Sequence, residues 1–115
     1  MQNIIDVAKE IHTPSALTQE QGDIIFNTIT SFFEKGETVV LDFSNVESMI
    51  SPFLNNAIGK LYEKYTTKDI KKLLELKEFP PSKNGTLNLV ISNAKKYYSN
   101  KERYERAVKE VIDNE

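Results

Sequence analysis

Ser51 is the residue whose setting most clearly suggests chemistry. It opens the stretch "SPFLNNAIGKLY", which directly follows "TVVLDFSNVESMI" in the sequence. A serine hydroxyl at the start of a helix can receive a phosphoryl group, or it can cap the helix by accepting a hydrogen bond from a backbone N–H. Pro52, the next residue, suits the first helical position. The pattern predicts that Ser51 is first a helix N-cap and only second a phosphorylation switch.

The rest of the sequence lacks the motifs by which most enzyme sites are recognised. There is no Cys, which excludes disulfides, thiolate metal ligands and a cysteine nucleophile, and His12 is the only histidine. The four glycines are far apart in the sequence, so they form no glycine-rich phosphate-binding loop. No spacing of His, Asp or Glu matches a strong metal motif. We therefore predict no catalytic residue, no metal, no cofactor and no enzymatic activity.

Length and composition fit a single domain that covers residues 1–115. Hydrophobic residues make up 39% of the chain, which is enough for one modest core. There is no apolar run of about 18 residues, so we expect no membrane span. The N-terminal sequence "MQNIIDVAKEI" does not read as a secretory signal. These features predict a cytoplasmic protein.

Charge is distributed unevenly along the chain. Residues 1–59 carry two Lys and eight acidic residues (2 − 8 = −6), and residues 60–115 carry thirteen Lys or Arg and nine acidic residues (13 − 9 = +4). The two halves together give the net charge of −2. Solvated helix faces explain this pattern most simply. The alternative is a basic face that binds an acidic partner or the acidic half of another copy, so a homo-oligomer is one expectation.

Hydrophobic periodicity predicts the elements of the first half. Residues 3–11 predict a strand, and residues 17–37 predict a helix with a Thr18–Gln21 capping box and with Gly36 at its end. Gly22, early in this helix, predicts a close backbone contact. The continuous apolar run in residues 38–43 predicts a central strand that is buried on both faces.

In the second half, the helix that begins at Ser51 carries Gly59 near its buried side, where we expect a strand to approach. Residues 66–74 predict a short helix capped by Thr67, and residues 75–79 predict a short edge strand. Residues 86–98 have strand-like composition but helical spacing over more than three turns, and their length favours a helix. A capping box at residues 99–102 predicts a separate terminal helix, although one long, bent helix is the alternative. Strands alternating with helices predict an α/β fold with a small mixed sheet.

A basic segment with tyrosines, residues 93–106, is the one candidate for contact with nucleic acid. Lysine and arginine can bind phosphates while aromatic rings stack on bases. On the helical interpretation, however, Tyr97, Tyr98 and Tyr104 belong largely to the apolar face, and two glutamates dilute the charge. We therefore regard nucleic-acid binding as the less favoured alternative.

The stretch "VVLDFSNVESMISPFLNNAIGKLY" resembles the STAS-like family of unknown function, a set of bacterial domains related to the STAS domains of anti-sigma-factor antagonists. The resemblance lies in an aliphatic run ending in Leu-Asp-Phe, a short turn, and a helix that opens with Ser-x-Phe-Leu-Asn. It implies a small mixed sheet with helices mainly on one face. It also implies a regulatory role in which a histidine-kinase-like ATPase docks at the start of this helix and phosphorylates a Ser or Thr there. The acceptor position falls on Pro52, and only Ser51 just before it retains a hydroxyl.

The leading functional hypothesis is thus a non-enzymatic signalling module that binds a protein partner, such as a kinase-like ATPase, at the strand–turn–helix of residues 42–56. The alternative is a sensor of a small ligand or nucleotide that uses the same helix N-terminus. Because adjacent helical residues point about 100° apart, at least one of two neighbouring asparagines should be exposed. The predicted partner-binding residues are Asn45, Glu47, Ser51, Phe53, Asn55 and Asn56, with Ser51 also the candidate phosphorylation site.

Overall fold

The fold is built on a small parallel sheet with helices packed against it. The computed structural model describes residues 2–113, and it describes side chains up to residue 99. The sheet has the order β1-β3-β5, and each neighbouring pair of strands is parallel. A second, two-stranded parallel sheet pairs β2 with β4. The strands are β1 (Gln2–Asp6), β2 (Ser15–Ala16), β3 (Thr38–Asp42), β4 (Ser48–Met49) and β5 (Leu74–Lys77).

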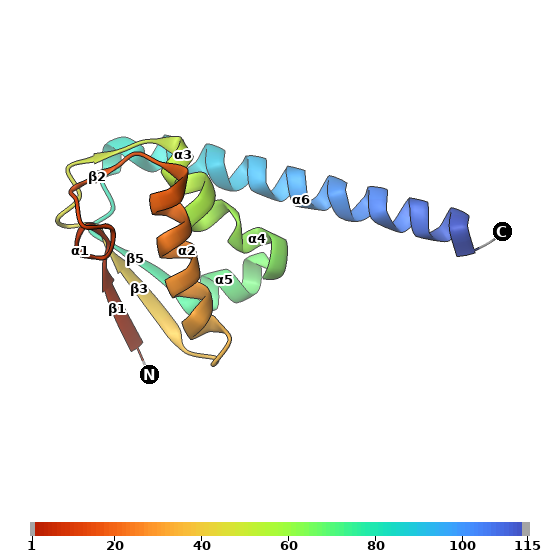
Figure 1. Ribbon diagram of the computed structural model, residues 1–115, viewed down its shortest axis with the longest axis horizontal. Coiled ribbons are helices and arrows are strands. Elements are labelled where there is room, and N and C mark those ends of the chain that lie inside the picture. The colour runs from red at the N-terminus through yellow and green to blue at the C-terminus, as the bar shows by residue number, and fades with distance from the viewer. Residues whose placement is uncertain (1, 114–115) are drawn as a thin grey trace.

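Helical segments connect the strands, and Figure 1 shows α2 beside the sheet and α6 running away from it. α2 packs on β3 and on the helical segment that begins at residue 51. A π-helical stretch interrupts that segment, and a 3-10 turn precedes α6. The helices are α1 (Val7–Ile11), α2 (Gln19–Phe33), α3 (Ser51–Leu54), the π segment (Asn55–Gly59), α4 (Leu61–Lys64), α5 (Thr67–Leu73), the 3-10 turn (Pro81–Lys83) and α6 (Asn84–Asp113).

The predicted α/β class is confirmed, and β3 is the central strand as expected. One feature of the prediction is corrected, because the strands that pair among residues 2–113 are all parallel and form no mixed sheet. The reason is visible in the connections: each return to the sheet passes through helices, and such crossovers join parallel strands.

The two faces of the sheet differ in what covers them. On the inner face, Ile5, Val39 and Leu41 belong to the hydrophobic core. On the outer face, the side chain of Ile4 is 64% exposed and Glu75 is also exposed. Val40 lies between these two in the register and is buried, but it is not part of the core cluster. The helices therefore cover one face of the sheet, which agrees with the expectation.

Close contact between α2 and α3 depends on a glycine. A Cβ atom added at Gly22 would lie 2.5 Å from the carbonyl oxygen of Phe53 and 2.8 Å from the Cβ of Asn56. The predicted backbone contact at Gly22 is thus confirmed. Gly59 lies instead against α6, with Val90 and Ala94 at ordinary contact distance, so the expected approach of a strand at this glycine is wrong.

Several predicted boundaries change for local reasons. The strand predicted for residues 3–11 ends at Asp6, because the Asp6 carboxylate accepts a hydrogen bond from the Lys9 backbone N–H and so caps α1. The cap of α5 is Thr66 and not Thr67, since the Thr66 hydroxyl accepts from the Asp69 N–H. The predicted capping box at Thr18 and Gln21 is present, and Gly36 adopts a positive φ of 74° after α2.

The C-terminal region is one helix. The prediction of helix for residues 86–98 is confirmed, because α6 runs continuously from Asn84 to Asp113. The separate helix predicted to begin near residue 99 is therefore wrong, and the alternative of a single long helix is the observed one. Val90 is buried beside Gly59, where α6 packs on the π segment, which explains why periodicity outweighed strand propensity here.

Candidate functional site

Ser51 lies on the surface at the first turn of α3. The N-cap of this helix is Ile50, and no side chain caps it, so the prediction that Ser51 is the N-cap is wrong. The chain enters the helix one residue earlier than predicted because Ile50 has the extended conformation of a cap residue, with φ −131° and ψ 169°. Within the described residues, the Ser51 hydroxyl forms no hydrogen bond. Its hydroxyl is therefore not needed to start the helix.

This position leads to a direct stability test. Replacing Ser51 with alanine is expected to change the free energy of unfolding by less than about 0.5 kcal/mol. The substitution removes only an exposed hydroxyl that has no hydrogen-bond partner within the described residues. Replacing Thr18 with alanine provides the matched control. The Thr18 hydroxyl accepts from the Gln21 N–H at 3.1 Å, so its loss should cost about 1 kcal/mol. Urea denaturation of both variants measures the difference, and a cost of about 1 kcal/mol for Ser51→Ala would restore the capping interpretation.

Two of the predicted partner-binding residues have structural roles within the fold. Phe53 is fully buried in the core, so its prediction as a contact residue is wrong. Asn56 is partly buried, and its side-chain amide donates to Asp23 Oδ1 at 3.0 Å and to the Gln19 carbonyl at 3.3 Å. Lys60 Nζ also contacts Asp23 Oδ1 at 2.7 Å, and this hydrogen bond holds the pKa of Asp23 below its ordinary value. Asn56 therefore joins the π segment to α2.

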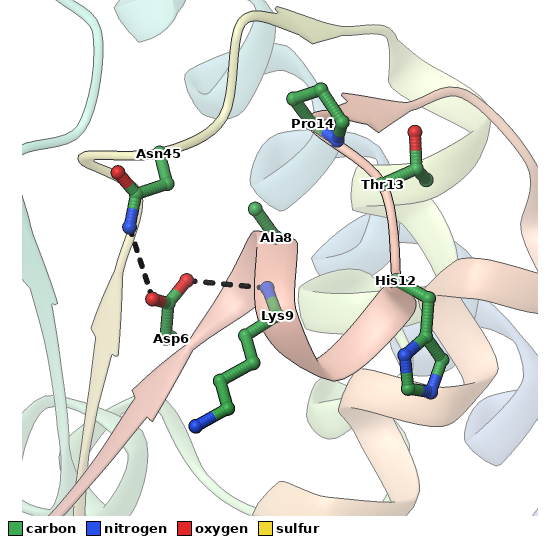
Figure 2. A pocket seen from close by; sticks show the side chains of 7 residues that line it. All are labelled: Asp6, Ala8, Lys9, His12, Thr13, Pro14 and Asn45. Carbon is green, nitrogen blue, oxygen red and sulfur yellow. Dashed lines mark hydrogen bonds between the residues drawn. The ribbon is translucent and has the colours of Figure 1, made fainter.

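Asn45 is exposed, but its amide is also engaged within the fold. Its Nδ2 donates to Asp6 Oδ2 at 3.0 Å, while Asp6 Oδ1 accepts from the Lys9 backbone N–H (Figure 2). These contacts lie at the carboxyl ends of β1 and β3, beside an open hollow of about 490 Å³. His12 lies at the same hollow and has a positive φ of 64° as the C-cap of α1. Asn45 thus ties the turn after β3 to the end of β1.

The remaining predicted residues share the surface around the start of α3. Glu47, Ser51 and Asn55 are all exposed. Ser51 and Asn55 are four residues apart, so they lie on one side of the helix. Glu47 is held beside β2 because its backbone N–H donates to the Pro14 carbonyl at 2.8 Å. These three residues can contact a partner without disturbing the core.

Two apolar residues on the same surface were not predicted. The Ile50 N–H donates to the Ala16 carbonyl, which places Ile50 beside Leu17. Their side chains are 44% and 40% exposed, respectively. Sequence reasoning missed them because β2 and β4 have two residues each, too few for a periodic signal. We define the docking surface as Leu17, Glu47, Ile50, Ser51 and Asn55.

The turn between β3 and β4 contains a local hydrogen bond between Ser44 and Asp42. The Ser44 backbone N–H donates to Asp42 Oδ1 at 2.9 Å. Hydrogen bonds from Ser44 hold the pKa of Asp42 below its ordinary value, with a smaller contribution from the charge of Lys77. The ionised Asp42 carboxylate therefore stabilises this turn by accepting a hydrogen bond from Ser44.

The basic segment 93–106 lies only partly within the described side chains. Tyr97 is 63% exposed, so its assignment to the apolar face is wrong, whereas Tyr98 is partly buried and packs edge-to-face on Tyr97 with ring centroids 5.0 Å apart. Lys95 lies 5.8 Å from the centre of the Tyr62 ring. Tyr104 and the basic residues beyond 99 lie outside the described side chains.

The part of the chain that the structure describes holds no cluster of metal-ligating side chains and no candidate membrane span. There, no three His, Asp or Glu side chains gather in a way that could hold a metal ion. No helix in this part is both long enough and apolar enough to cross a membrane.

Comparison with known proteins identifies a family. The family model described as "STAS-like domain of unknown function" matches residues 21–82, which is more than half of the chain. The matched range contains α2 from Gln21 onward, β3, β5 and the whole docking surface except Leu17. Comparisons with curated proteins and with solved structures give no match. The chain belongs to the family of STAS-like domains of unknown function.

Proposed function

We propose that this protein is a non-enzymatic regulatory module that binds a protein partner at the docking surface. The observation that supports this most directly is the exposed, unbonded hydroxyl of Ser51 next to Ile50, whose exposed apolar side chain lies beside that of Leu17. Apolar side chains beside polar groups are the usual composition of a protein interface. The helix that carries Ser51 is anchored in the core by the buried side chains of Phe53 and Leu54.

Ser51 suits a regulatory role because a charge there would leave the fold intact. A negative charge at the first turn of a helix interacts favourably with the helix dipole. The same charge beside Ile50 and Leu17 would oppose burial of this surface against an apolar partner surface. Phosphorylation of Ser51 would therefore change binding while leaving the domain folded. The resemblance of the sequence to STAS-like domains suggests a histidine-kinase-like ATPase as the partner class.

The experiment compares binding and stability in the same variants. The candidate partners are the proteins encoded beside the gene for this chain, each purified and measured by calorimetry or biolayer interferometry. We expect Ser51→Asp and Ile50→Asp to weaken binding at least about tenfold, which corresponds to about 1.4 kcal/mol. Ser92→Asp, at an exposed serine on α6, is the matched control and should bind as the wild type does.

Stability measurements on the same proteins exclude an indirect effect. Ser51→Asp should unfold at the same denaturant concentration as the wild type or slightly higher, since the helix dipole favours the new charge. Incubation of the wild type with the partner and ATP, followed by mass spectrometry, tests for phosphate on Ser51. A partner that binds all three variants as tightly as the wild type would refute this docking surface.

A further inference from the structure

The outer edge of β1 is open. In the sheet order β1-β3-β5, β1 pairs with β3 on one side, and no strand among residues 2–113 pairs with it on the other. A parallel strand uses only alternate residues to bond its neighbour, so the others direct their N–H and C=O groups away from β3. Such groups form a template for another strand.

The two edges of the sheet differ in how they are protected. β5 is four residues long, carries Glu75 and Lys77, and is followed by Glu78 with a positive φ of 55°. Charged side chains and an abrupt change of backbone direction are common means of blocking edge pairing. β1, with the sequence "QNIID", has neither Lys nor Pro, and its central residue Ile4 is 64% exposed. β1 is therefore the edge that remains competent to pair.

A groove follows the β1 edge and gives room for an added strand. It encloses about 580 Å³, with β1 on one side and α2 on the other. Glu10 of α1 accepts a hydrogen bond from the Thr28 hydroxyl at 2.9 Å and so fixes one part of its wall. A strand edge beside a helix is a recurrent setting for strand addition. The lining residues are Ile4, Ile5, Asp6, Lys9, Glu10, His12, Thr28 and Phe32.

We propose that a second copy of this chain occupies the groove by pairing its own β1, antiparallel, about a twofold axis at Ile4. The result is a dimer with one continuous six-stranded sheet. In this register Ile4 faces Ile4 of the second copy on the outer face, so two side chains that are exposed in each protomer cover one another. A shift of the axis to a neighbouring residue would leave each Ile4 without its apolar counterpart.

Charge and hydrogen bonding are compatible with this pairing. Gln2 of one copy lies opposite Asp6 of the other at both ends of the ladder, so an amide donor meets a carboxylate. Gln2 Nε2 donates to Glu75 Oε2 at 3.5 Å within its own protomer, and its second N–H is left for this contact. Asp6 already accepts from the Lys9 N–H and from Asn45, but a carboxylate has capacity for further donors. The two Asp6 residues are separated along the ladder by four residues, roughly 13 Å, which exceeds the screening length of about 8 Å at physiological salt.

The first test is the mass in solution, measured by light scattering on a sizing column at about 100 µM. We expect twice the 13.2 kDa of one chain. Ile4→Lys should halve the measured mass, because it places two ammonium groups opposite each other at the axis. Leu89→Lys is the matched control, since Leu89 on α6 is 62% exposed and should leave the dimer intact. Circular dichroism checks that both variants are folded.

The second test defines the register. Because the chain has no Cys, a single Ile4→Cys substitution gives one thiol per protomer. Directly opposed residues of antiparallel strands lie close enough for a disulfide, so mild oxidation should convert most of the protein into a covalent dimer. Leu89→Cys should remain uncrosslinked.

The outcomes separate this proposal from the docking surface, which uses different residues. A wild-type mass of 13.2 kDa at 100 µM would overturn the dimer and leave the β1 edge to a strand from a different protein. A dimer that persists in Ile4→Lys, with no crosslink through Ile4→Cys, would show that the copies associate elsewhere and would also overturn it.

Discussion

Replacing Phe53 with alanine is expected to lower the free energy of unfolding by about 3–5 kcal/mol, because it removes a fully buried ring from a packed core. The loss includes the transfer of the ring to water and the cavity that remains, since the backbone of α3 is fixed against Gly22 and cannot collapse far. Denaturation by guanidinium, followed by circular dichroism, measures the change.

Asn55→Ala is the control for this experiment. Asn55 is exposed two residues after Phe53, so its removal should change stability by less than about 0.5 kcal/mol. The comparison matters for mapping the docking surface, because loss of binding in Phe53→Ala would report damage to the fold and not a lost contact. A Phe53→Ala protein within about 1 kcal/mol of the wild type would contradict the burial of this ring.

Gly22→Ala is expected to have the second largest effect, a net loss of up to about 2 kcal/mol. The added methyl would lie 2.5 Å from the Phe53 carbonyl oxygen and 3.0 Å from the Ala57 backbone nitrogen, and backbone atoms cannot move aside cheaply. Overpacking of this kind typically costs about 1–3 kcal/mol and occasionally more, and it outweighs the gain of about 1 kcal/mol in helix propensity. Thermal and denaturant unfolding both report the loss.

Gly85→Ala is the matched control, because Gly85 is also helical but a Cβ there meets nothing within 4 Å. It should stabilise the protein by about 0.4–1 kcal/mol through restriction of the unfolded chain. The opposite signs of the two substitutions test the close contact itself. If both stabilise the protein, α2 and α3 lie farther apart than the structure shows.

Long periodic segments were predictable from the sequence, and short ones were not. The α2 helix and the long α6 helix have enough turns for a hydrophobic period to be unambiguous, and the apolar run at β3 identifies a central strand. The transition from β1 to α1 was missed because one residue, Asp6, ends the strand and caps the helix at once. No alternation or period extends over so few residues.

The docking surface was predicted only in part for a related reason. Its polar members were found by their position beside the turn, but burial depends on which side of the helix packs against α2. The close approach at Gly22 turns Phe53 and Asn56 inward. Ile50 and Leu17 are brought together by the pairing of β2 with β4, which no local pattern reveals.

The parallel pairing of every described strand has a consequence for how the chain folds. The paired residues Gln2 and Thr38 are 36 positions apart, and Val39 and Leu74 are 35 apart. No hairpin is available among these pairs to start the sheet. The entropic cost of closing a long loop therefore comes before the strand contacts that offset it. We therefore expect the crossover helices to form early and the sheet to assemble late and slowly. During synthesis, the edge of β3 that pairs with β5 stays exposed until β5 has been made. The chain is most prone to aggregation during this interval.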